Sequence, residues 1–293
     1  MSRVYVTTTA RASALELVWA DVLARHYRMT GARVRFLGGG EPELRSTLTL
    51  SYNDYDATET PIPRYVDVLG PAHYQRWWAG SDARVHVIGE PAQRQHSEAW
   101  RAHLLSSNAP LPTAIVVHPD IDIPDIGALS SQYGSDAVRW WLLRDPTLNP
   151  DRIVHLANKD LHKRLSTLID RATGLVHRYR DGEPPAGGTW PPVSGPVHAA
   201  LTRSDFVAAT EAVWQIVDAA ASYLTRSRPW DLAISGPDQE LDTVLATLLA
   251  ACRTLANELT PFLPDLATRV AEQTFALSGS LAPPRSVYAR LSK

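Results

Sequence analysis

The sequence predicts an α/β domain built on a parallel sheet, followed by an all-α helical bundle. In the first half of the chain, short β-rich runs alternate with segments of helical periodicity, which is the pattern of βαβ units. From about residue 132 onward only helical periodicity remains, interrupted by a Pro- and Gly-rich stretch at residues 181–192. We therefore expect an α/β domain over residues 1–145 and a helical bundle over residues 146–293.

The first strand–helix–strand unit is expected at the N-terminus. Residues 4–8 are rich in β-branched and aromatic side chains, and residues 15–27 carry apolar side chains at helical spacing. Gly31 is expected to end this helix, and residues 34–37 to form the next strand. Such a connection makes a right-handed crossover between two parallel strands.

A second unit of the same kind follows. Strands are expected at residues 85–89 and 113–118, with a helix between them at about residues 91–106. Two such units predict a doubly wound sheet, whose ligands bind outside the carboxyl ends of the strands. The triple glycine at residues 38–40 lies at such an end and is either an ordinary loop or a place where a ligand approaches the backbone. It lacks the spacing of a dinucleotide-binding loop.

The second half contains the periodic segments that a helical bundle requires. Apolar side chains recur at helical spacing over residues 136–144, 152–178, 204–225, 241–259 and 264–276. The chain has no internal repeat, so we expect a bundle rather than a solenoid.

Composition and charge exclude several classes of function. The 293 residues carry a net charge of −2, which excludes the overall basic field of a DNA-coating protein. The single cysteine, Cys252, excludes a disulfide framework and a cysteine-based zinc site. No apolar run approaches the roughly 20 residues of a membrane helix, so we expect a cytoplasmic protein without a membrane partner. No lysine precedes Lys159, which excludes a P-loop or Schiff-base lysine from the first half.

Short segments along nearly the whole chain match those of one enzyme family, in the same order. The segments are residues 20–31, Tyr65-Val66-Asp67, Trp77-Trp78, residues 85–89, His96 with Trp100, residues 133–144, residues 158–171, Tyr223 with Arg228-Pro229-Trp230, and residues 260–264. Together they resemble methionyl-tRNA synthetase, a class I aminoacyl-tRNA synthetase. The resemblance implies a Rossmann-type catalytic domain followed by a helical bundle like the family's anticodon-binding domain.

Both ATP signatures of the family are missing. Ala10 and Ser13 stand where the resemblance places the two histidines of the His-x-Gly-His signature, and a hydroxyl is a poor replacement for imidazole as a phosphate clamp. Residues 119–132, where the Lys-Met-Ser-Lys-Ser signature belongs, contain three aspartates and no lysine, and we expect an acidic loop there. One such donor is worth about 3–4 kcal/mol of transition-state stabilisation. The resemblance implies ATP as a cofactor, but these losses argue against its use.

The connective insertion of the family is also nearly absent. Only residues 40–63 separate the second strand from Tyr65, where the family carries a connective domain, often with zinc. The polar remnant at residues 51–59 is expected to be a loop. Because the family uses this region to present the acceptor end of tRNA, ordinary aminoacylation is disfavoured.

The resemblance implies an amino-acid-like small molecule as the ligand. Glu41 falls near the family's acidic residue for the substrate amine, while Tyr65 and Asp67 would line the opposite wall. His96 and Trp100 lie one helical turn apart and share a face, as a hydrogen-bond partner and a wall of the pocket. The alternatives are that Glu41 is a solvated loop carboxylate and that Trp100 and His96 are core residues. The spacing of His96 from the next histidine is a weak metal pattern, and we expect no metal.

Two residues of the second half are candidates for RNA binding. Trp230 stands where the family stacks a tryptophan on an anticodon base, and Lys163 could meet a phosphate nearby. The acidic residues of the same region and the absence of a basic field argue against this interpretation, so tRNA is not the favoured partner. The alternative is that Trp230 is a packing residue.

Two functions follow from the resemblance and its departures. The first is a synthetase-derived ligase or acyl-transfer enzyme of small-molecule biosynthesis, since relatives of the family act in natural-product pathways, some of them with a cupin partner in hydrazine formation. Such an enzyme would keep the amino-acid pocket and use either ATP or a preactivated donor such as an aminoacyl-tRNA. The second is a non-catalytic pseudo-synthetase that binds an effector, tRNA or a partner enzyme. Binding of ATP, of an amino acid, of both or of neither distinguishes the two functions.

Overall fold

The chain forms two compact units, Met1–Pro150 and Asp151–Lys293, which are described separately. The computed structural model describes residues 1–9, 12–39, 43–51, 78–90, 108–119, 125–145, 147–191, 194–235, 238–276 and 279–292. The predicted helix at about residues 91–106 and the predicted loop beyond residue 51 lie outside these described residues.

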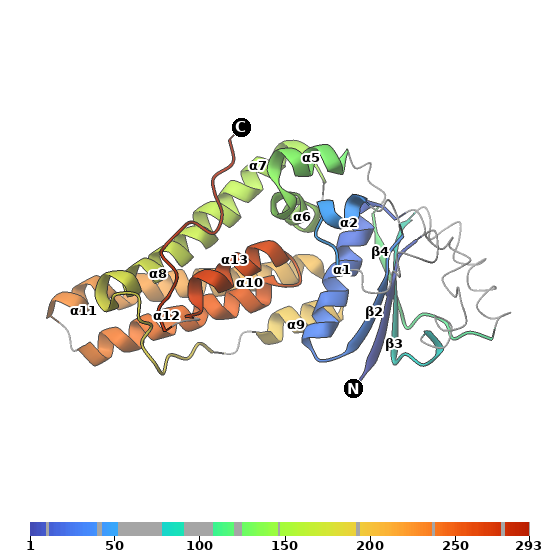
Figure 1. Cartoon of the computed structure of the whole chain (residues 1–293). Helices are drawn as coiled ribbons and strands as arrows, with labels where there is room; N and C mark the ends of the chain where they lie inside the picture. The colour runs from blue at the N-terminus through green and yellow to red at the C-terminus, as the bar shows by residue number, and fades with distance from the viewer. Residues whose placement is uncertain are drawn as a thin grey trace. The chain divides into compact units, whose positions relative to one another are not determined.

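The first unit contains a four-stranded parallel sheet with the strand order β2-β1-β3-β4 (Figure 1). The strands are β1 (Arg3–Thr7), β2 (Arg33–Leu37), β3 (Ala83–Gly89) and β4 (Ala114–His118). This arrangement confirms the predicted Rossmann-type sheet. Because β1 pairs with β2 on one side and β3 on the other, the strand order reverses beside β1, and the crevice at its carboxyl end is the expected ligand position.

The helix α1 (Ala14–Met29) connects β1 to β2 and confirms the predicted helix. Ser13 begins it, since the Ser13 hydroxyl accepts a hydrogen bond from the backbone N–H of Glu16 at 3.2 Å. Gly31 follows its last turn with a φ of 85°, a left-handed conformation that glycine adopts without a steric penalty. The buried face of α1 includes Leu15, Val18 and Val22, which cover the sheet.

The structure corrects the predicted acidic loop at residues 119–132 from residue 126 onward, while residues 120–124 lie outside the described part of the chain. Residues Ile126–Tyr133 form the helix α5, and the Asp125 carboxylate caps it by accepting a hydrogen bond from the Ala128 N–H at 3.1 Å. A carboxylate at a helix N-terminus is stabilised by the helix dipole, so Asp125 is a structural cap rather than a loop charge. The first unit also contains α6 (Ser135–Arg144) and the five-residue helix α2 (Glu43–Thr47), which is too short to give a periodic signal.

The second unit is a helical bundle, as predicted (Figure 1). Its elements are η2 (Pro150–Arg152, shared with the end of the first unit), α7 (Ile153–Leu156), η3 (Ala157–Ser166), α8 (Thr167–Arg180), α9 (Ser194–Thr202), α10 (Phe206–Ser227), α11 (Pro229–Ser235), α12 (Asp238–Leu259) and α13 (Pro264–Thr274). The elements α7, η3 and α8 follow one another without a break and match the predicted helix at residues 152–178. The η3 segment has π-helical hydrogen bonding, and the short helices α9 and α11 were not predicted.

The core of the bundle joins helices that are distant in sequence. Val176 of α8 packs with Leu241, Leu245 and Leu249 of α12, and Leu281 of the C-terminal segment completes the cluster. Full burial of each such side chain contributes roughly 1.5–3 kcal/mol. This cluster therefore fixes α8, α12 and the chain end to one another.

The C-terminal segment, residues 281–291, lies along the helix formed by η3 and α8 (Figure 1). The side chain of Asn158 donates to the Leu291 carbonyl at 2.9 Å and accepts from the Leu291 N–H at 2.8 Å. The rings of His162 and His177 donate to the carbonyls of Tyr288 at 3.0 Å and Ala282 at 2.9 Å. These side chains satisfy the backbone of a segment that has no strand partner among the described residues.

A buried carboxylate links three parts of the first unit. Asp21 of α1 lies 2.9 Å from the Arg139 guanidinium of α6, and both side chains are inaccessible to solvent. The Asp21 carboxylate also accepts from Arg25 at 2.9 Å and from the backbone and hydroxyl of Ser51 at 2.7 and 2.6 Å. Arg139 in turn donates to the carbonyl of Leu48 at 2.9 Å. These bonds tie α1, α6 and residues 48–51 together.

The charge of Asp21 is held by its partners. Burial acts to raise the pKa of Asp21, but the charges of Arg139 and Arg25 and the Ser51 hydrogen bond outweigh it, and the pKa is lowered. A carboxyl group with a lowered folded pKa stabilises the fold above its unfolded pKa of about 3.9 and loses that contribution as the pH falls through the folded pKa. The network is therefore fully formed at neutral pH.

We expect the substitution Asp21→Asn to lower the free energy of unfolding by about 3–5 kcal/mol, because it leaves Arg139 charged and buried without its counter-ion. Urea denaturation of the full chain measures this change. Asp82→Asn is the matched control in the same unit, since the Asp82 carboxylate accepts from the exposed backbone N–H of Arg3 and should contribute roughly 1 kcal/mol or less. Equal losses in the two variants would contradict the central role of Asp21.

We expect opposite effects from two glycine-to-alanine substitutions in the second unit. A Cβ at Gly188 would lie 2.1 Å from the backbone carbonyl carbon of Ala246 in α12, so Gly188→Ala must displace the 182–191 segment and destabilise by roughly 1–3 kcal/mol. A Cβ at Gly174 in α8 meets no atom within 4 Å, so Gly174→Ala should stabilise by about 1 kcal/mol through helix propensity. Thermal denaturation measures both. A stable Gly188→Ala protein would show that the segment does not pack on α12.

Candidate functional site

Four polar residues gather where β1 and β4 end and α1 begins. Thr9 follows β1, Ser13 and Glu16 lie in the first turn of α1, and His118 is the last residue of β4. We call these four residues the carboxyl-edge cluster. Glu16 and His118 are only 3% and 6% exposed, although both can carry a charge. Buried groups of this kind at the carboxyl ends of parallel strands mark a candidate ligand or catalytic site.

The His118 ring is oriented by its backbone and by a tryptophan. Its Nδ1 lies 2.9 Å from the Pro119 carbonyl oxygen, and a carbonyl only accepts, so Nδ1 carries a proton and donates it. The indole of Trp19 meets the ring edge-on, with centroids 6.0 Å apart. In the neutral ring, Nε2 is therefore the acceptor atom.

The Nε2 atom faces the first turn of α1. It lies 3.5 Å from the Ser13 hydroxyl oxygen and 3.6 Å from Oε2 of Glu16. The hydroxyl can donate to Nε2, and the carboxylate would stabilise a positive charge on the ring whenever Nε2 takes up a proton. Ser13, His118 and Glu16 thus form a chain of hydroxyl, imidazole and carboxylate, the residue types that exchange protons in acid–base catalysis.

Glu16 also organises the backbone of the cluster. Its Oε1 accepts a hydrogen bond from the N–H of Thr9, the residue that follows the end of β1. The carboxylate lies in the first turn of α1, where the helix dipole stabilises a negative charge. As a result, this end of the sheet holds an anionic group, which attracts an ammonium group and repels phosphate.

The neighbouring end of β2 is closed by a threonine. The Thr8 hydroxyl accepts from the Gly39 N–H at 2.7 Å, and the Thr8 N–H donates to the Leu37 carbonyl at 3.2 Å. The first two glycines of the triple-glycine stretch therefore stay close to β1. Gly40 lies outside the described residues.

A second histidine lies on β3, opposite Thr7 of β1. His86 is 1% exposed, and its Nδ1 lies 2.7 Å from the Thr7 hydroxyl oxygen. Burial lowers the pKa of His86 to about 3, because a charged imidazolium would lose its hydration there. His86 is therefore neutral at physiological pH.

We expect His86 to contribute to acid sensitivity. The folded protein resists protonation of His86 until about pH 3, whereas the unfolded chain binds that proton near pH 6.5, so stability falls with decreasing pH across this window by on the order of 4 kcal/mol. The substitution His86→Gln should flatten the dependence of the free energy of unfolding on pH between 6.5 and 3. Urea denaturation at several pH values measures it, and His155→Gln, at an exposed histidine, is the control. An unchanged slope in the His86→Gln protein would show that His86 is not the titrating group.

Most of the sequence-predicted site residues lie outside the described part of the chain. These are Ala10, Glu41, Tyr65, Asp67, His96 and Trp100. Ser13 is described, and it caps α1 within hydrogen-bonding distance of His118. The assignment of Glu41, Tyr65, Asp67, His96 and Trp100 to an amino-acid pocket remains a prediction.

Sequence reasoning did not identify Glu16 and His118. The Ser-x-x-Glu spacing of Ser13 and Glu16 is a capping-box signal that marks the start of a helix. In the structure the Glu16 side chain reaches the N–H of Thr9, four residues before Ser13. No local signal connects His118 to this turn, because 105 residues separate it from Ser13 and only the parallel sheet brings them together.

The two predicted RNA-binding residues lie apart in the second unit. Lys163 is exposed on η3, while Trp230 is half-buried in α11, next to the start of α12. The start of α12 contacts the far end of α8, where Arg180 binds Asp242 at 2.5 Å. Lys163 and Arg180 are separated by about 25 Å of helix, at a rise of about 1.5 Å per residue. The structure therefore does not bring Lys163 and Trp230 into one site.

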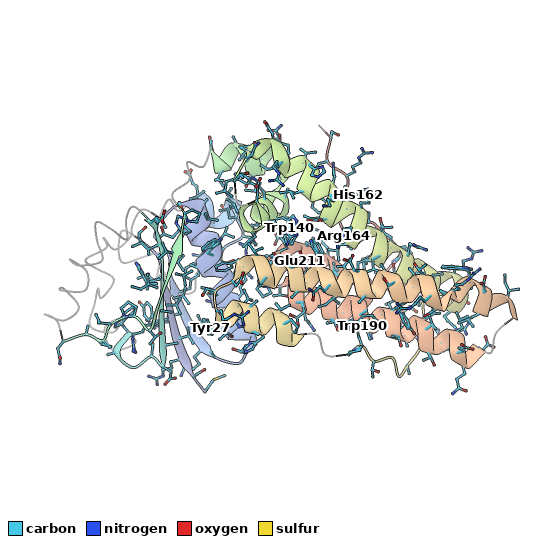
Figure 2. All side chains as sticks on the ribbon, turned by 180° about the vertical axis from the view of Figure 1, so that it is seen from behind. Tyr27, Trp140, His162, Arg164, Trp190 and Glu211 are labelled. Carbon is cyan, nitrogen blue, oxygen red and sulfur yellow. The ribbon has the colours of Figure 1, made fainter. Side chains whose placement is uncertain are left out.

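The residue after Lys163 is engaged within the bundle. Arg164 lies on the same helix as His162, and Trp190 lies on the segment between α8 and α9 (Figure 2). The Arg164 guanidinium binds both carboxylate oxygens of Asp218 at 2.7 Å and lies 5.3 Å from the ring centre of the buried Trp214. This arginine serves the packing of η3 on α10, so it adds little to a phosphate site.

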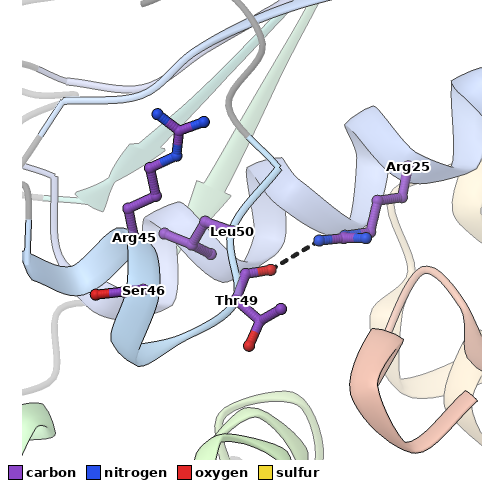
Figure 3. Close-up of a pocket in the computed structure, with 5 residues that line it drawn as sticks. All are labelled: Arg25, Arg45, Ser46, Thr49 and Leu50. Atoms are coloured by element: carbon purple, nitrogen blue, oxygen red, sulfur yellow. Dashed lines mark hydrogen bonds between the residues drawn. The ribbon is translucent and has the colours of Figure 1, made fainter. Parts of the chain in front are cut away.

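A basic hollow lies on another part of the first unit. Arg25, Arg45, Ser46, Thr49 and Leu50 line a cavity of about 400 Å³ (Figure 3). Arg25 donates to the Thr49 carbonyl at 2.7 Å and also binds Asp21, so its charge already serves the buried network. The hollow is consequently a product of that network, and the carboxyl-edge cluster is the better candidate for function.

Metal-ligand clusters and membrane-spanning helices are both absent from the described ranges. No group of three or more histidine, cysteine, aspartate or glutamate side chains in these ranges is placed to hold a metal ion. Within the same ranges, no helix has both the length and the apolar character needed to cross a bilayer.

Comparison with known proteins shows one consistent relationship. No protein-family model matches the chain. Among curated proteins, it is 28% identical over 230 residues to a methionine–tRNA ligase of Synechocystis sp., covering 68% of this chain and 42% of that protein. It is 26% identical over 249 residues to the methionine–tRNA ligase of Enterococcus faecalis, covering 72% of this chain and 37% of that protein. The chain thus spans less than half the length of these relatives.

Solved structures show the same relationship in three dimensions. The apo form of Mycobacterium tuberculosis methionyl-tRNA synthetase superposes with a TM-score of 0.78 at 19% identity, covering 100% of this chain and 99% of that one. The same enzyme in complex with methionyl-adenylate gives a TM-score of 0.75 at 18% identity, covering 99% of this chain and 100% of that one.

The parallel sheet, its helical C-terminal unit and these matches show a chain that is like the class I aminoacyl-tRNA synthetases. Within that class, the chain is methionyl-tRNA synthetase-like in sequence and in fold.

Proposed function

We propose that this protein binds an amino-acid-like ligand at the carboxyl edge of its sheet and transfers an acyl group that has been activated elsewhere. The proposal places it in the biosynthesis of a small molecule rather than in ordinary charging of tRNA. The relatives are named as ligases of methionine and tRNA, and one neighbour was solved with methionyl-adenylate, which supports an aminoacyl group as the transferred unit. Acylation of an N-hydroxylated amine, as a step on the way to a hydrazine, is one reaction of this kind, and a partner enzyme in the cytoplasm would supply that acceptor.

The observation that carries the proposal is the anionic carboxyl-edge cluster. The Glu16 carboxylate accepts from Thr9 and faces His118 at the N-terminus of α1, next to the position of the missing histidine signature. A negative charge there opposes binding of a triphosphate and suits the ammonium group of an amino acid. The protein therefore fits an acceptor of activated acyl groups better than an enzyme that activates them with ATP.

A preactivated donor would make both ATP signatures unnecessary. Ala10 and Ser13 replace the two imidazoles, and the three aspartates of residues 119–132 replace the lysines that would neutralise phosphates. An aminoacyl ester needs none of these groups, because its activation has already taken place. The helical second unit, which resembles an anticodon-binding domain in the family, would then serve to hold an aminoacyl-tRNA donor, with Trp230 stacking on a base.

The second candidate function is a non-catalytic pseudo-synthetase. The same replacements of both signatures favour it, because a protein that only binds a ligand, a tRNA or a partner enzyme requires neither signature. The two functions differ in whether a bound amino acid is ever transferred to an acceptor.

The first test is amino-acid-dependent ATP–pyrophosphate exchange with a panel of proteinogenic and N-hydroxylated amino acids. We expect no exchange, together with a rise in melting temperature from at least one amino acid and none from ATP. The His96→Ala and Trp100→Ala variants should lose that rise while keeping their melting temperatures without ligand. Exchange with any amino acid would contradict a preactivated donor, and ligand binding that persists in both variants would contradict the predicted pocket.

A further inference from the structure

We infer that Ser13 is a nucleophile that takes up the acyl group before transfer, with His118 as its base. The proposed function leaves open how the acyl group passes from donor to acceptor. The carboxyl-edge cluster contains the two groups that a covalent route requires, a hydroxyl and an imidazole whose acceptor nitrogen faces it. The inference rests on the proposed function and assigns residues of the same site to it.

The contact between the two groups has the geometry of a nucleophile and its base. The Ser13 hydroxyl oxygen lies 3.5 Å from Nε2 of His118, a distance typical of such pairs before a substrate tightens them. Ser13 is partly exposed, whereas His118 is 6% exposed, so a ligand can reach the hydroxyl while the base stays shielded. The hydrogen bond from Nδ1 of His118 to the Pro119 carbonyl holds the ring in the tautomer in which Nε2 can accept a proton.

The surroundings stabilise both charges that develop during attack. The backbone N–H of Glu16 donates to the Ser13 hydroxyl oxygen at 3.2 Å, at the positive end of the α1 dipole, which stabilises negative charge on that oxygen. The Glu16 carboxylate lies 3.6 Å from Nε2 and stabilises the positive charge that His118 acquires. Glu16 therefore acts as a positioning residue for the charged His118 ring, and it does so from the same nitrogen that faces Ser13, while the Pro119 carbonyl holds the opposite nitrogen, Nδ1.

The reaction balances with two partners of stated class, an aminoacyl ester and a primary amine. The Ser13 oxygen attacks the ester carbonyl as its proton moves to Nε2, the new C–O bond forms, and the bond to the donor alcohol breaks as that oxygen takes the proton from Nε2. The amine then attacks the seryl ester, an amide bond forms, the C–O bond to Ser13 breaks, and the Ser13 oxygen takes the proton that the amine nitrogen gives up, through His118. No oxidant, reductant or nucleotide is consumed.

The ester chemistry has two sources, the 3′ end of an aminoacyl-tRNA and a small-molecule ester. The full-length protein is mixed with a pool of tRNAs charged with the proteinogenic amino acids, or with the corresponding p-nitrophenyl esters. The reactions are stopped in acid, and intact and peptide mass spectrometry measure any aminoacyl adduct. Hydroxylamine in parallel reactions serves as the acceptor amine. Because it also attacks these esters directly, only the hydroxamate formed in excess of a reaction without protein is counted as transfer.

The variants separate chemistry from folding. Ser13→Asn removes the hydroxyl but keeps a side chain that caps α1, whereas Ser13→Ala loses the cap as well and serves as the stability comparison. His118→Gln retains a polar side chain without the base. Circular dichroism and melting temperature establish that each variant folds.

We expect an adduct of one aminoacyl group on the peptide that contains Ser13, its complete loss in Ser13→Asn, and a 10²–10⁴-fold slower appearance in His118→Gln. Adduct formation from charged tRNA alone would identify tRNA as the donor, and formation from both would show that the ester suffices. Hydroxamate formation that persists in Ser13→Asn, or an adduct on another peptide, would overturn the role of Ser13 and leave the proposed function standing. The absence of both adduct and hydroxamate with every donor would overturn the proposed function as well.

Discussion

The first unit depends on the buried carboxylate of Asp21. Removing a charge from water is costly, and Asp21 is held in its charged form only because Arg139, Arg25 and Ser51 surround it. These partners come from α1, α6 and residues 48–51, so one side chain fixes how those parts lie against each other. Since α1 is held by this network and covers the sheet, its first turn has a defined position at the carboxyl ends of the strands. The positions of the carboxyl-edge cluster residues that α1 carries are fixed in the same way.

The carboxyl-edge cluster combines a synthetase-like fold with a different set of polar groups. The end of the parallel sheet and the start of α1 still form the crevice that this class of protein uses, but the groups that bind phosphate are absent from the sequence. In their place, the His118 imidazole lies 3.5 Å from a hydroxyl and 3.6 Å from a carboxylate. A carboxylate at this end of the sheet attracts ammonium groups, and this charge is the basis of the proposed acyl transfer.

Much of the fold was predictable because each element carries a local signal. The four strands, α1, α6 and the long helices of the bundle all follow from periodicity and from end signals such as Gly31. The acidic stretch before residue 133 was misassigned because an aspartate reads equally as a loop charge and as a helix cap, and Asp125 proved to be the cap of α5. The short helices α2, α9 and α11 have too few turns to show a period, and the π-helical turn of η3 depends on packing that no local pattern records.

The sequence by itself determined the fold class, the resemblance to the synthetases and the loss of both signatures, because each is a matter of residue type and spacing along the chain. The Ser-x-x-Glu spacing of Ser13 and Glu16 is also a local capping signal, although it was not used to predict the start of α1. Only the tertiary structure decided that Ser13 faces His118 and that Glu16 contacts both the ring and the end of β1. The physical reason is that parallel strands align their carboxyl ends whatever their distance in sequence, so a group at residue 118 reaches a helix that begins at residue 14.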